Sequence, residues 1–173
     1  MALRNILKEG DETLTKRCRP VTDFNGRLHE LLDDMAETML SANGVGLAAP
    51  QVGVLRRAVV VLETNTPEGE EHVIELVNPT ILESSGEQTE PEGCLSTPGS
   101  YGMVTRPDHV KVRAQDRNGN WFEIEGVDLT ARAFCHELDH LDGHMFTELC
   151  DHILSEEELD AYYAQQREQK EAE

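Results

Sequence analysis

Two histidines and a glutamate in the segment His136-Glu137-Leu138-Asp139-His140 have the residue types and spacing of a metal-dependent hydrolase. Residues four apart lie on one face of a helix, so both imidazoles can reach the same metal ion. Glu137 follows the first histidine, where its carboxylate can act as a general base on water that the metal activates. Two surface histidines on an amphipathic helix are the alternative interpretation, so the motif needs support from a further ligand.

A third ligand is required because a catalytic zinc-type site has three protein ligands and one open position. Cys94 is the best candidate, since it lies in the segment 92–96, where glycine and turn-forming residues leave a thiolate accessible. Burial as a small apolar residue is the commoner fate of a single cysteine. We expect that fate for Cys18, Cys135 and Cys150. On a helix, Cys135 would also project about 100° away from the adjacent histidine, which makes it a poor ligand for the same ion.

A protease that cleaves internal peptide bonds is the rival enzyme for the same motif. The long metzincin pattern requires a glycine and then a third histidine. Gly143 is present, but Phe146 stands at the histidine position and His144 is out of step. A downstream carboxylate, either Glu148 or one in the segment 156–158, would then have to complete the site, as in other zinc proteases.

Three helices are expected, and one of them carries the histidine motif. It spans 128–142, with Asp128 as its N-cap. A second helix, 26–42, follows from apolar residues spaced three and four positions apart. A third begins at Ser155, because Ser155 and Glu158 have the spacing of a capping box.

Short strands joined by turns account for much of the remaining chain. The β-branched run 58–62 predicts one strand, and a second runs over 72–77 and ends at Asn78-Pro79. Asn118-Gly119 indicates a tight hairpin turn. Further β-rich segments are 81–87, 109–114 and 121–125. These strand–turn–strand units favour an α+β fold, with antiparallel strands packed around the central helix that carries the HExxH motif and with N- and C-terminal helices.

Length and charge limit the classes of function. A chain of 173 residues suits one domain over residues 1–173, with 155–173 as an acidic C-terminal helix. Its formal net charge of −19 argues against a general nucleic-acid binder and against adhesion to an anionic membrane. Residues 63–92 contain nine acidic residues and no Lys or Arg, so part of the acidity is local, and a ribosome contact through less acidic regions stays open.

Hydropathy predicts neither a membrane span nor a targeting segment. No run approaches the roughly 20 apolar residues that a spanning helix needs. The first ten residues contain no apolar stretch of signal-peptide length. We therefore expect a cytoplasmic protein.

Three segments, in order, resemble the signature motifs of peptide deformylases. They are GVGLAAPQ at 44–51, EGCLS at 92–96 and HELDH at 136–140. Each motif alone is weak to moderate, but all three in this order are highly specific, and the resemblance extends to about Asp151. It implies removal of the formyl group from the N-terminal formyl-methionine of nascent polypeptides, with release of formate.

The resemblance also implies roles for individual residues. The implied metal ligands are Cys94, His136 and His140. Glu137 would be the general base, and the Gln51 amide and the Leu95 backbone N–H would stabilise the oxyanion. The family's ion is typically Fe(II), with Zn(II), Ni(II) or Co(II) able to substitute, and one thiolate with two imidazoles suits several of these metals. The implied setting is a bacterial cytoplasm, near the ribosomal exit tunnel, without DNA or membrane partners.

A structural metal site or a peptide-binding module is the non-enzymatic alternative. A structural zinc site would normally close its fourth position with another Cys or His. The presence of Glu137 and Gln51 argues against such a closed site.

The substrate-binding residues are expected beside the motifs. Gly46, with Gly44, removes a side chain where another backbone must come close, as when a peptide adds like a strand, although a simple loop that ends the preceding helix is the alternative. The expected substrate contacts, including the methionine pocket, are Val45, Gly46, Gly93, Leu95 and Ala133, with parts of Arg132 and His136. Glu92 and Arg106 are expected either to pair behind the site or to form a solvated pair.

Overall fold

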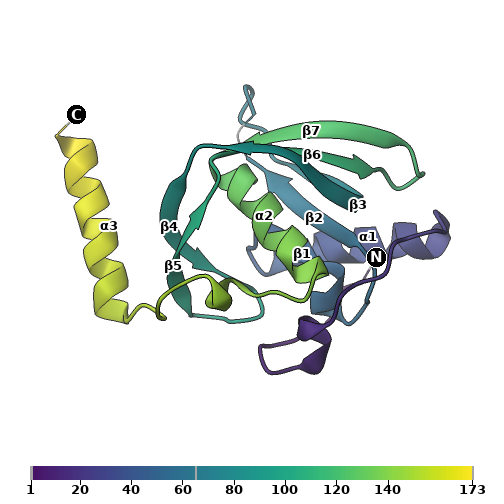
Figure 1. Ribbon diagram of the computed structural model, residues 1–173, viewed down its shortest axis with the longest axis horizontal. Coiled ribbons are helices and arrows are strands. Elements are labelled where there is room, and N and C mark those ends of the chain that lie inside the picture. Colours follow the sequence, from purple (N-terminus) through teal and green to yellow (C-terminus); the bar gives the residue numbers. More distant parts are fainter. Residues whose placement is uncertain (1, 65, 173) are drawn as a thin grey trace.

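The computed structural model describes residues 2–64 and 66–172, and within them two antiparallel sheets surround a central helix (Figure 1). The larger sheet has the strand order β1-β2-β3-β6-β7. Its strands, in that order, are Gly46–Ala48, Ala58–Glu63, His72–Ser85, His109–Gln115 and Trp121–Val127. The smaller sheet pairs β4 (Gln88–Gly93) with β5 (Tyr101–Arg106). The α-helices are α1 (Gly26–Ser41), α2 (Leu129–Leu141) and α3 (Glu156–Glu171), and the short 3-10 helices are η1 (Glu12–Thr15), η2 (Ala49–Val52) and η3 (Phe146–Glu148).

The larger sheet is covered on both faces, which explains the continuous apolar run of β2. Val59 and Val61 pack with α2 in one core cluster. The intervening Val60 and Ala58 pack with α1 in the other. Successive strand residues point to opposite faces, so a strand between two helices is apolar at every position. The fold is therefore α+β, as expected, with α2 in the middle of the molecule (Figure 1).

The C-terminal helix α3 stands apart from the two sheets, at the far left of Figure 1. Its N-terminus has the predicted capping box, because the Ser155 hydroxyl accepts from the Glu158 N–H and the Glu158 carboxylate accepts from the Ser155 N–H. None of the helix residues is buried. Local capping and its own sequence, rather than core packing, therefore define this helix.

The structure corrects the prediction that the second strand ends at Asn78-Pro79. β3 continues through these residues to Ser85, with a register shift against β6 between Val77 and Thr80. Asn78 adopts a φ of 50°, and its side chain binds the backbone of Val21 and the Gln115 amide. A bulge lets the strand accommodate a proline, which has no N–H to donate to the ladder.

Two further features of local structure differ from the predictions. The strands β4 and β5 were not predicted, and neither was the short strand β1 in the glycine-rich segment. The side chain of Asp128 does not cap α2; the residue has a φ of 53°, and its N–H donates to the carbonyl of Asp108. The boundary of the helix was right, but its start is fixed by a backbone contact with the turn between β5 and β6.

Among the described residues, no helix is both long and apolar enough to cross a bilayer.

Candidate metal centre

Cys94, His136 and His140 come together in space, although the first lies more than forty residues before the others. Their candidate ligand atoms all lie within 4.8 Å of one another. The cysteine Sγ is 3.4 Å from His140 Nε2, and the two Nε2 atoms are 3.2 Å apart. Cys94 directly follows β4, and both histidines lie on one face of α2. The end of β4 and one face of α2 therefore supply ligand atoms to the same point.

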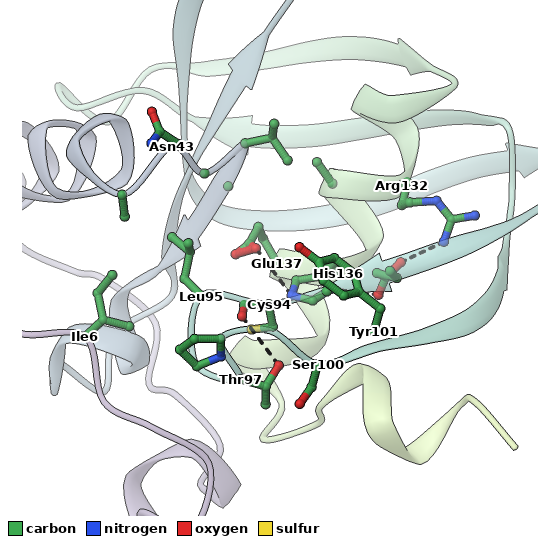
Figure 2. Close-up of a pocket in the computed structure, with 18 of the residues that line it drawn as sticks. Ile6, Asn43, Cys94, Leu95, Thr97, Ser100, Tyr101, Arg132, His136 and Glu137 are labelled. Carbon is green, nitrogen blue, oxygen red and sulfur yellow. Dashed lines mark hydrogen bonds and ion pairs between the residues drawn. The ribbon is translucent and has the colours of Figure 1, made fainter. Parts of the chain in front are cut away.

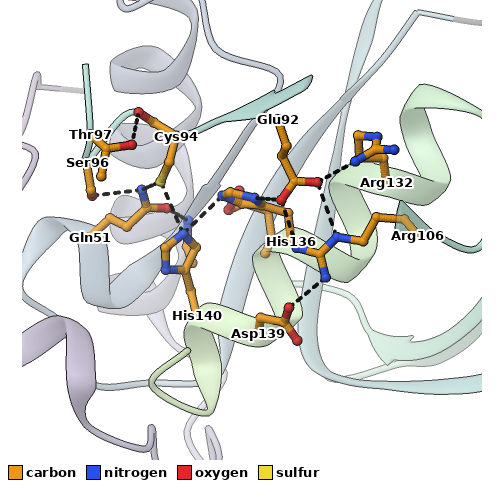
Figure 3. Close-up of polar contacts among 12 residues, drawn as sticks. Gln51, Glu92, Cys94, Ser96, Thr97, Arg106, Arg132, His136, Asp139 and His140 are labelled. Carbon is orange, nitrogen blue, oxygen red and sulfur yellow. Dashed lines mark hydrogen bonds and ion pairs between the residues drawn. The ribbon is translucent and has the colours of Figure 1, made fainter. Parts of the chain in front are cut away.

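A buried carboxylate fixes the orientation of His136 (Figure 3). Its Nδ1 lies 2.7 Å from Glu92 Oε2, which leaves Nε2 directed at the ligand cluster. Glu92 also receives hydrogen bonds from Arg106 at 2.8 and 3.2 Å and from Arg132 at 2.8 Å. Arg106 extends the network to Asp139, at 2.7 Å. A carboxylate behind a ligating histidine fixes its tautomer and raises its basicity, as at many metal sites.

The predicted pairing of Glu92 with Arg106 is confirmed, and the solvated alternative was wrong. Both side chains are almost fully buried, at 4 % and 6 % exposure. Burial opposes ionisation of Glu92, but hydrogen bonds from His136 and Arg106, together with their charges, outweigh it and hold the pKa of the carboxyl well below its usual range. Glu92 is therefore a fixed negative charge behind the histidine.

The two histidines have different electrostatic environments. Burial and the neighbouring charge of His136 lower the pKa of His140 to about 3, so its imidazole is neutral. For His136, burial acts in the same direction but is outweighed by hydrogen bonding to Cys94 and by the carboxylates of Glu137 and Glu92, which raise its pKa. A neutral imidazole is the form that binds a metal, and a cation at the cluster would compete with the proton on His136.

Glu137 lies beside the cluster without joining it. Its Oε1 is 3.7 Å from His136 Nε2, and its Oε2 is buried with no hydrogen-bond partner among the described residues. Burial raises the pKa of this carboxyl to about 7. Gly46 makes room for it, because a Cβ on this glycine would lie 2.8 Å from the Glu137 side chain. A carboxyl with a near-neutral pKa and a free oxygen is suited to general acid–base chemistry.

The space left by the missing side chains of Gly44 and Gly46 is occupied by other side chains of the same protein. The Cβ of a residue in place of Gly44 would meet Leu95 at 2.7 Å, as that of Gly46 would meet Glu137. The segment is also more than a helix-stop loop, since Gly46 begins β1 at the edge of the larger sheet.

Gln51 approaches the cluster from η2. Its Oε1 accepts from the Ala48 N–H at 2.9 Å, which turns the amide nitrogen toward the loop after β4. That nitrogen donates to Ser96 Oγ at 3.1 Å and lies 3.5 Å from Cys94 Sγ. The backbone carbonyls of Gln51 and Ser96 accept from Leu7 and Glu9 in the N-terminal segment. The amide donor is thus held in place from several sides.

A cavity of about 640 Å³ opens beside the cluster (Figure 2). All the residues expected to contact substrate line it: Val45, Gly46, Gly93, Leu95, Ala133, Arg132 and His136. Cys94 and Glu137 face the same cavity. A ligand in it would therefore lie next to the ligand atoms and the general-base candidate.

The carboxylates proposed for the protease alternative do not approach the cluster. Glu148 is exposed and lies 3.1 Å from His144, which is also exposed.

Of the other cysteines, Cys18 and Cys135 are buried in the core, and burial raises the pKa of each thiol to about 11. Cys150 is half-buried rather than buried, contrary to expectation. Within the described chain, the third ligand candidate is thus Cys94.

Sequence reasoning missed two contacts within the site. Arg132 was expected to line the pocket but not to bind Glu92, and Ser96 was not expected to receive the Gln51 amide. The position of Arg132 four residues before His136 could have indicated it, since both then lie on one helix face.

The donor set fits a transition-metal ion. One thiolate and two imidazoles are soft-to-borderline ligands that suit Fe(II), Zn(II), Ni(II) or Co(II). The two Nε2 atoms lie 3.2 Å apart, and a cation in the cluster would be bound by one lone pair from each neutral imidazole. The buried, unpartnered oxygen of Glu137 beside them is consistent with a water or substrate atom at an open position.

Comparison with known proteins places these motifs in context. The family model described as "Polypeptide deformylase" matches residues 3–156. The peptide deformylase of Agathobacter rectalis is 55 % identical over 148 residues, which cover 86 % of this chain and 90 % of that protein. The peptide deformylase of Caldanaerobacter subterraneus subsp. tengcongensis is 52 % identical and covers 92 % of this chain and 97 % of its own length.

Solved structures are similar over the same region. The crystal structure of peptide deformylase from Thermotoga maritima has a TM-score of 0.80 and 36 % identity, covering 87 % of this chain and 99 % of that one. A class I type b peptide deformylase from Acinetobacter baumannii, solved with Met-Ala-Ser bound, has a TM-score of 0.78 and 37 % identity, covering 85 % and 98 %.

Proposed function

The chain belongs to the polypeptide deformylase family, and from that premise we propose that Cys94, His136 and His140 hold one divalent metal ion beside the general base Glu137. Enzymes of this family remove the N-formyl group from nascent polypeptides, and this chain is a peptide deformylase acting on formyl-methionyl peptides. The observation that carries the proposed site is the convergence of the three ligand atoms within 4.8 Å, next to a buried carboxyl with an unpartnered oxygen.

The chemistry follows from the positions of the side chains. The metal, when bound, supplies Lewis-acid activation of water at neutral pH. Glu137 accepts a proton from the attacking water as the new C–O bond forms, and returns it to the amine as the C–N bond breaks. Formate and a peptide with a free amino terminus leave.

Two donors are proposed for the developing oxyanion. The Gln51 amide nitrogen is held near Cys94, and the Leu95 backbone N–H follows Cys94 in the chain. Losing one such donor costs about 2.7–4 kcal/mol of transition-state stabilisation in enzymes where this has been measured. The ground-state bond from Gln51 to Ser96 keeps the amide oriented before substrate arrives.

Substrate specificity is assigned to the cavity beside the metal centre. Val45, Leu95 and Ala133 offer apolar surface for the methionine side chain, with Gly46 and Gly93 beside them. The related Acinetobacter baumannii enzyme was solved with Met-Ala-Ser bound, which supports a peptide of this kind as the ligand.

The metal ion, the extent of the domain and the cellular setting are also part of the proposal. Fe(II) is proposed as the ion, with Zn(II), Ni(II) or Co(II) as substitutes. Residues 1–173 are proposed to form one catalytic domain that acts in a bacterial cytoplasm, close to the ribosome. The bacterial relatives support this setting.

Activity on two substrate classes tests the proposed function against the protease alternative. We expect protein purified without oxygen and supplied with Fe(II) or Ni(II) to release formate from formyl-Met-Ala-Ser and to leave casein intact. Acetyl-Met-Ala-Ser serves as the matched control. It has a methyl group in place of the formyl hydrogen, so its acyl group is larger and its hydrolysis cannot release formate. Casein cleavage without formate release would show that the site is a protease.

A further inference from the structure

A second groove, of about 770 Å³, lies at the N-terminal end of α1, away from the metal centre. It is bordered by the segment 19–25, the first turns of α1 and the loop 53–56. Its floor includes the buried side chains of Val21, Leu28 and Leu31. Four arginines line it: Arg4, Arg19, Arg27 and Arg56. Two carboxylates, Asp23 and Glu30, also line it, and the buried Asp34 pairs with Arg4, so the groove carries an excess of one positive charge in a chain of net charge −19.

Backbone pairing holds two of these arginines, Arg19 and Arg56, next to each other. Arg19 and Arg56 form an isolated parallel bridge, with the Arg19 N–H donating to the Leu55 carbonyl at 3.2 Å. The side chains of Arg19 and Arg27 make no hydrogen bond or ion pair with other described residues, whereas Arg4 pairs with Asp34 at 2.9 Å. Free guanidinium groups gathered in one groove leave their donors available to an external anion.

The distribution of charge along the molecule is uneven. The acidic helix α3 lies at the far left of Figure 1, and α1 lies behind the sheet toward the right. The first turn of α3 consists of three glutamates, whereas the first turn of α1 contains Arg27 and no acidic residue. An anionic surface would therefore repel the α3 end and attract the groove, which orients the molecule as it approaches.

We propose that this groove binds the sugar-phosphate backbone of RNA. The inference rests on the proposed function, because a substrate that is a nascent polypeptide is presented beside ribosomal RNA. RNA supplies regularly repeated phosphates, so it can engage several arginine forks at once, and the N-terminal end of α1 adds a favourable dipole. The groove is local enough to act despite the overall negative charge, since exposed charges more than about 10 Å away are largely screened at 0.1 M salt.

Binding of a fluorescein-labelled 20-nucleotide single-stranded RNA tests the proposal. Anisotropy is measured at several salt concentrations for three forms of the full chain. These are the wild type, Arg19→Glu/Arg27→Glu in the groove, and Arg167→Glu/Lys170→Glu on α3. The two double variants change the net charge equally, and all four side chains are exposed. Thermal unfolding confirms that each variant is folded.

We expect the groove variant to bind RNA at least tenfold more weakly than the wild type, and the α3 variant to bind within about twofold of it. The slope of log K against log salt should fall by roughly 1.4 for the groove variant, at about 0.7 per lost phosphate contact. Equal weakening in both variants, or no binding by the wild type, would overturn the proposal. So would displacement of the RNA by a twelve-residue polyglutamate at an equal concentration, because the groove would then recognise an acidic peptide.

Formate release from free formyl-Met-Ala-Ser separates this inference from the proposed function. We expect all three proteins to turn over the free peptide equally, since the groove lies away from the metal centre. Loss of RNA binding with full turnover would leave the enzyme assignment intact, while absence of turnover in every form would count against the proposed function and not against the groove.

Discussion

Replacement of Glu137 by glutamine is expected to lower kcat for formate release by about 10²–10⁴-fold, the usual contribution of a general acid–base group. Glutamine has nearly the same shape as glutamate, so it fits against Gly46, but it cannot accept a proton from the attacking water. The three metal-ligand candidates do not include Glu137. Metal content, measured by elemental analysis, should therefore stay at the wild-type level while turnover collapses.

Glu148→Gln is the matched control for this variant. It makes the same chemical change at an exposed carboxylate that pairs only with His144 among the described residues, and we expect kcat to remain unchanged. A Glu137→Gln protein with wild-type kcat would exclude Glu137 as the general base. Loss of the metal together with activity would instead assign Glu137 a ligand role.

Replacement of Glu92 by alanine should have the largest effect on stability. It would leave Arg106 and Arg132 buried without their carboxylate partner and His136 Nδ1 without its acceptor. Breaking a buried ion pair by removing one partner typically costs about 3–5 kcal/mol of unfolding free energy. Loss of the partner behind a ligating histidine typically weakens metal binding by about 10–100-fold. Urea denaturation and metal titration measure the two effects.

A second variant keeps this prediction testable if the alanine protein does not fold. Glu92→Gln preserves an acceptor for His136 but removes the charge, so we expect an intermediate loss of stability with smaller loss of metal affinity. Glu125→Gln, at a carboxylate with 57 % side-chain exposure beside His109, should change stability by no more than about 0.5 kcal/mol. Equal urea midpoints for the Glu92 variants and the wild type would contradict the role given to the network.

The elements governed by local rules could be predicted from the sequence. Helix α1 follows from its apolar spacing, and the capping box of α3 follows from two residues, Ser155 and Glu158. The strand β2 was recognised because β-branched residues form a continuous run. In each case the determining residues are neighbours in the chain, so a short window contains the information.

The elements governed by long-range contacts could not be predicted in the same way. β4 contains glutamates, a proline and a glycine, which are poor strand formers, and it forms because it pairs with β5. β3 continues past Pro79 because a bulge and the contacts of the Asn78 side chain with distant segments accommodate the proline. Propensity read along the chain does not include such partners.

In the candidate site, too, some features could be predicted from the sequence and others depend on long-range contacts. The HExxH spacing and the glycine- and turn-rich setting of Cys94 supplied the three ligand candidates, and the resemblance to a family added Gln51; the fold brings their atoms together. The reason for Gly46 emerged only in three dimensions, where the Glu137 side chain occupies the space of a Cβ. The double arginine support of Glu92 likewise depends on β4, β5 and α2 meeting at one place.

The central claim is that one divalent metal ion held by Cys94, His136 and His140 is required to remove the formyl group. Its most direct test is titration of metal-depleted protein with Fe(II) or Ni(II), without oxygen, while formate release from formyl-Met-Ala-Ser is followed. The account predicts no turnover in the presence of a chelator and activity that rises in proportion to added metal until it levels off at one ion per chain. Full formate release by the metal-free protein, or none at any metal concentration, would contradict it.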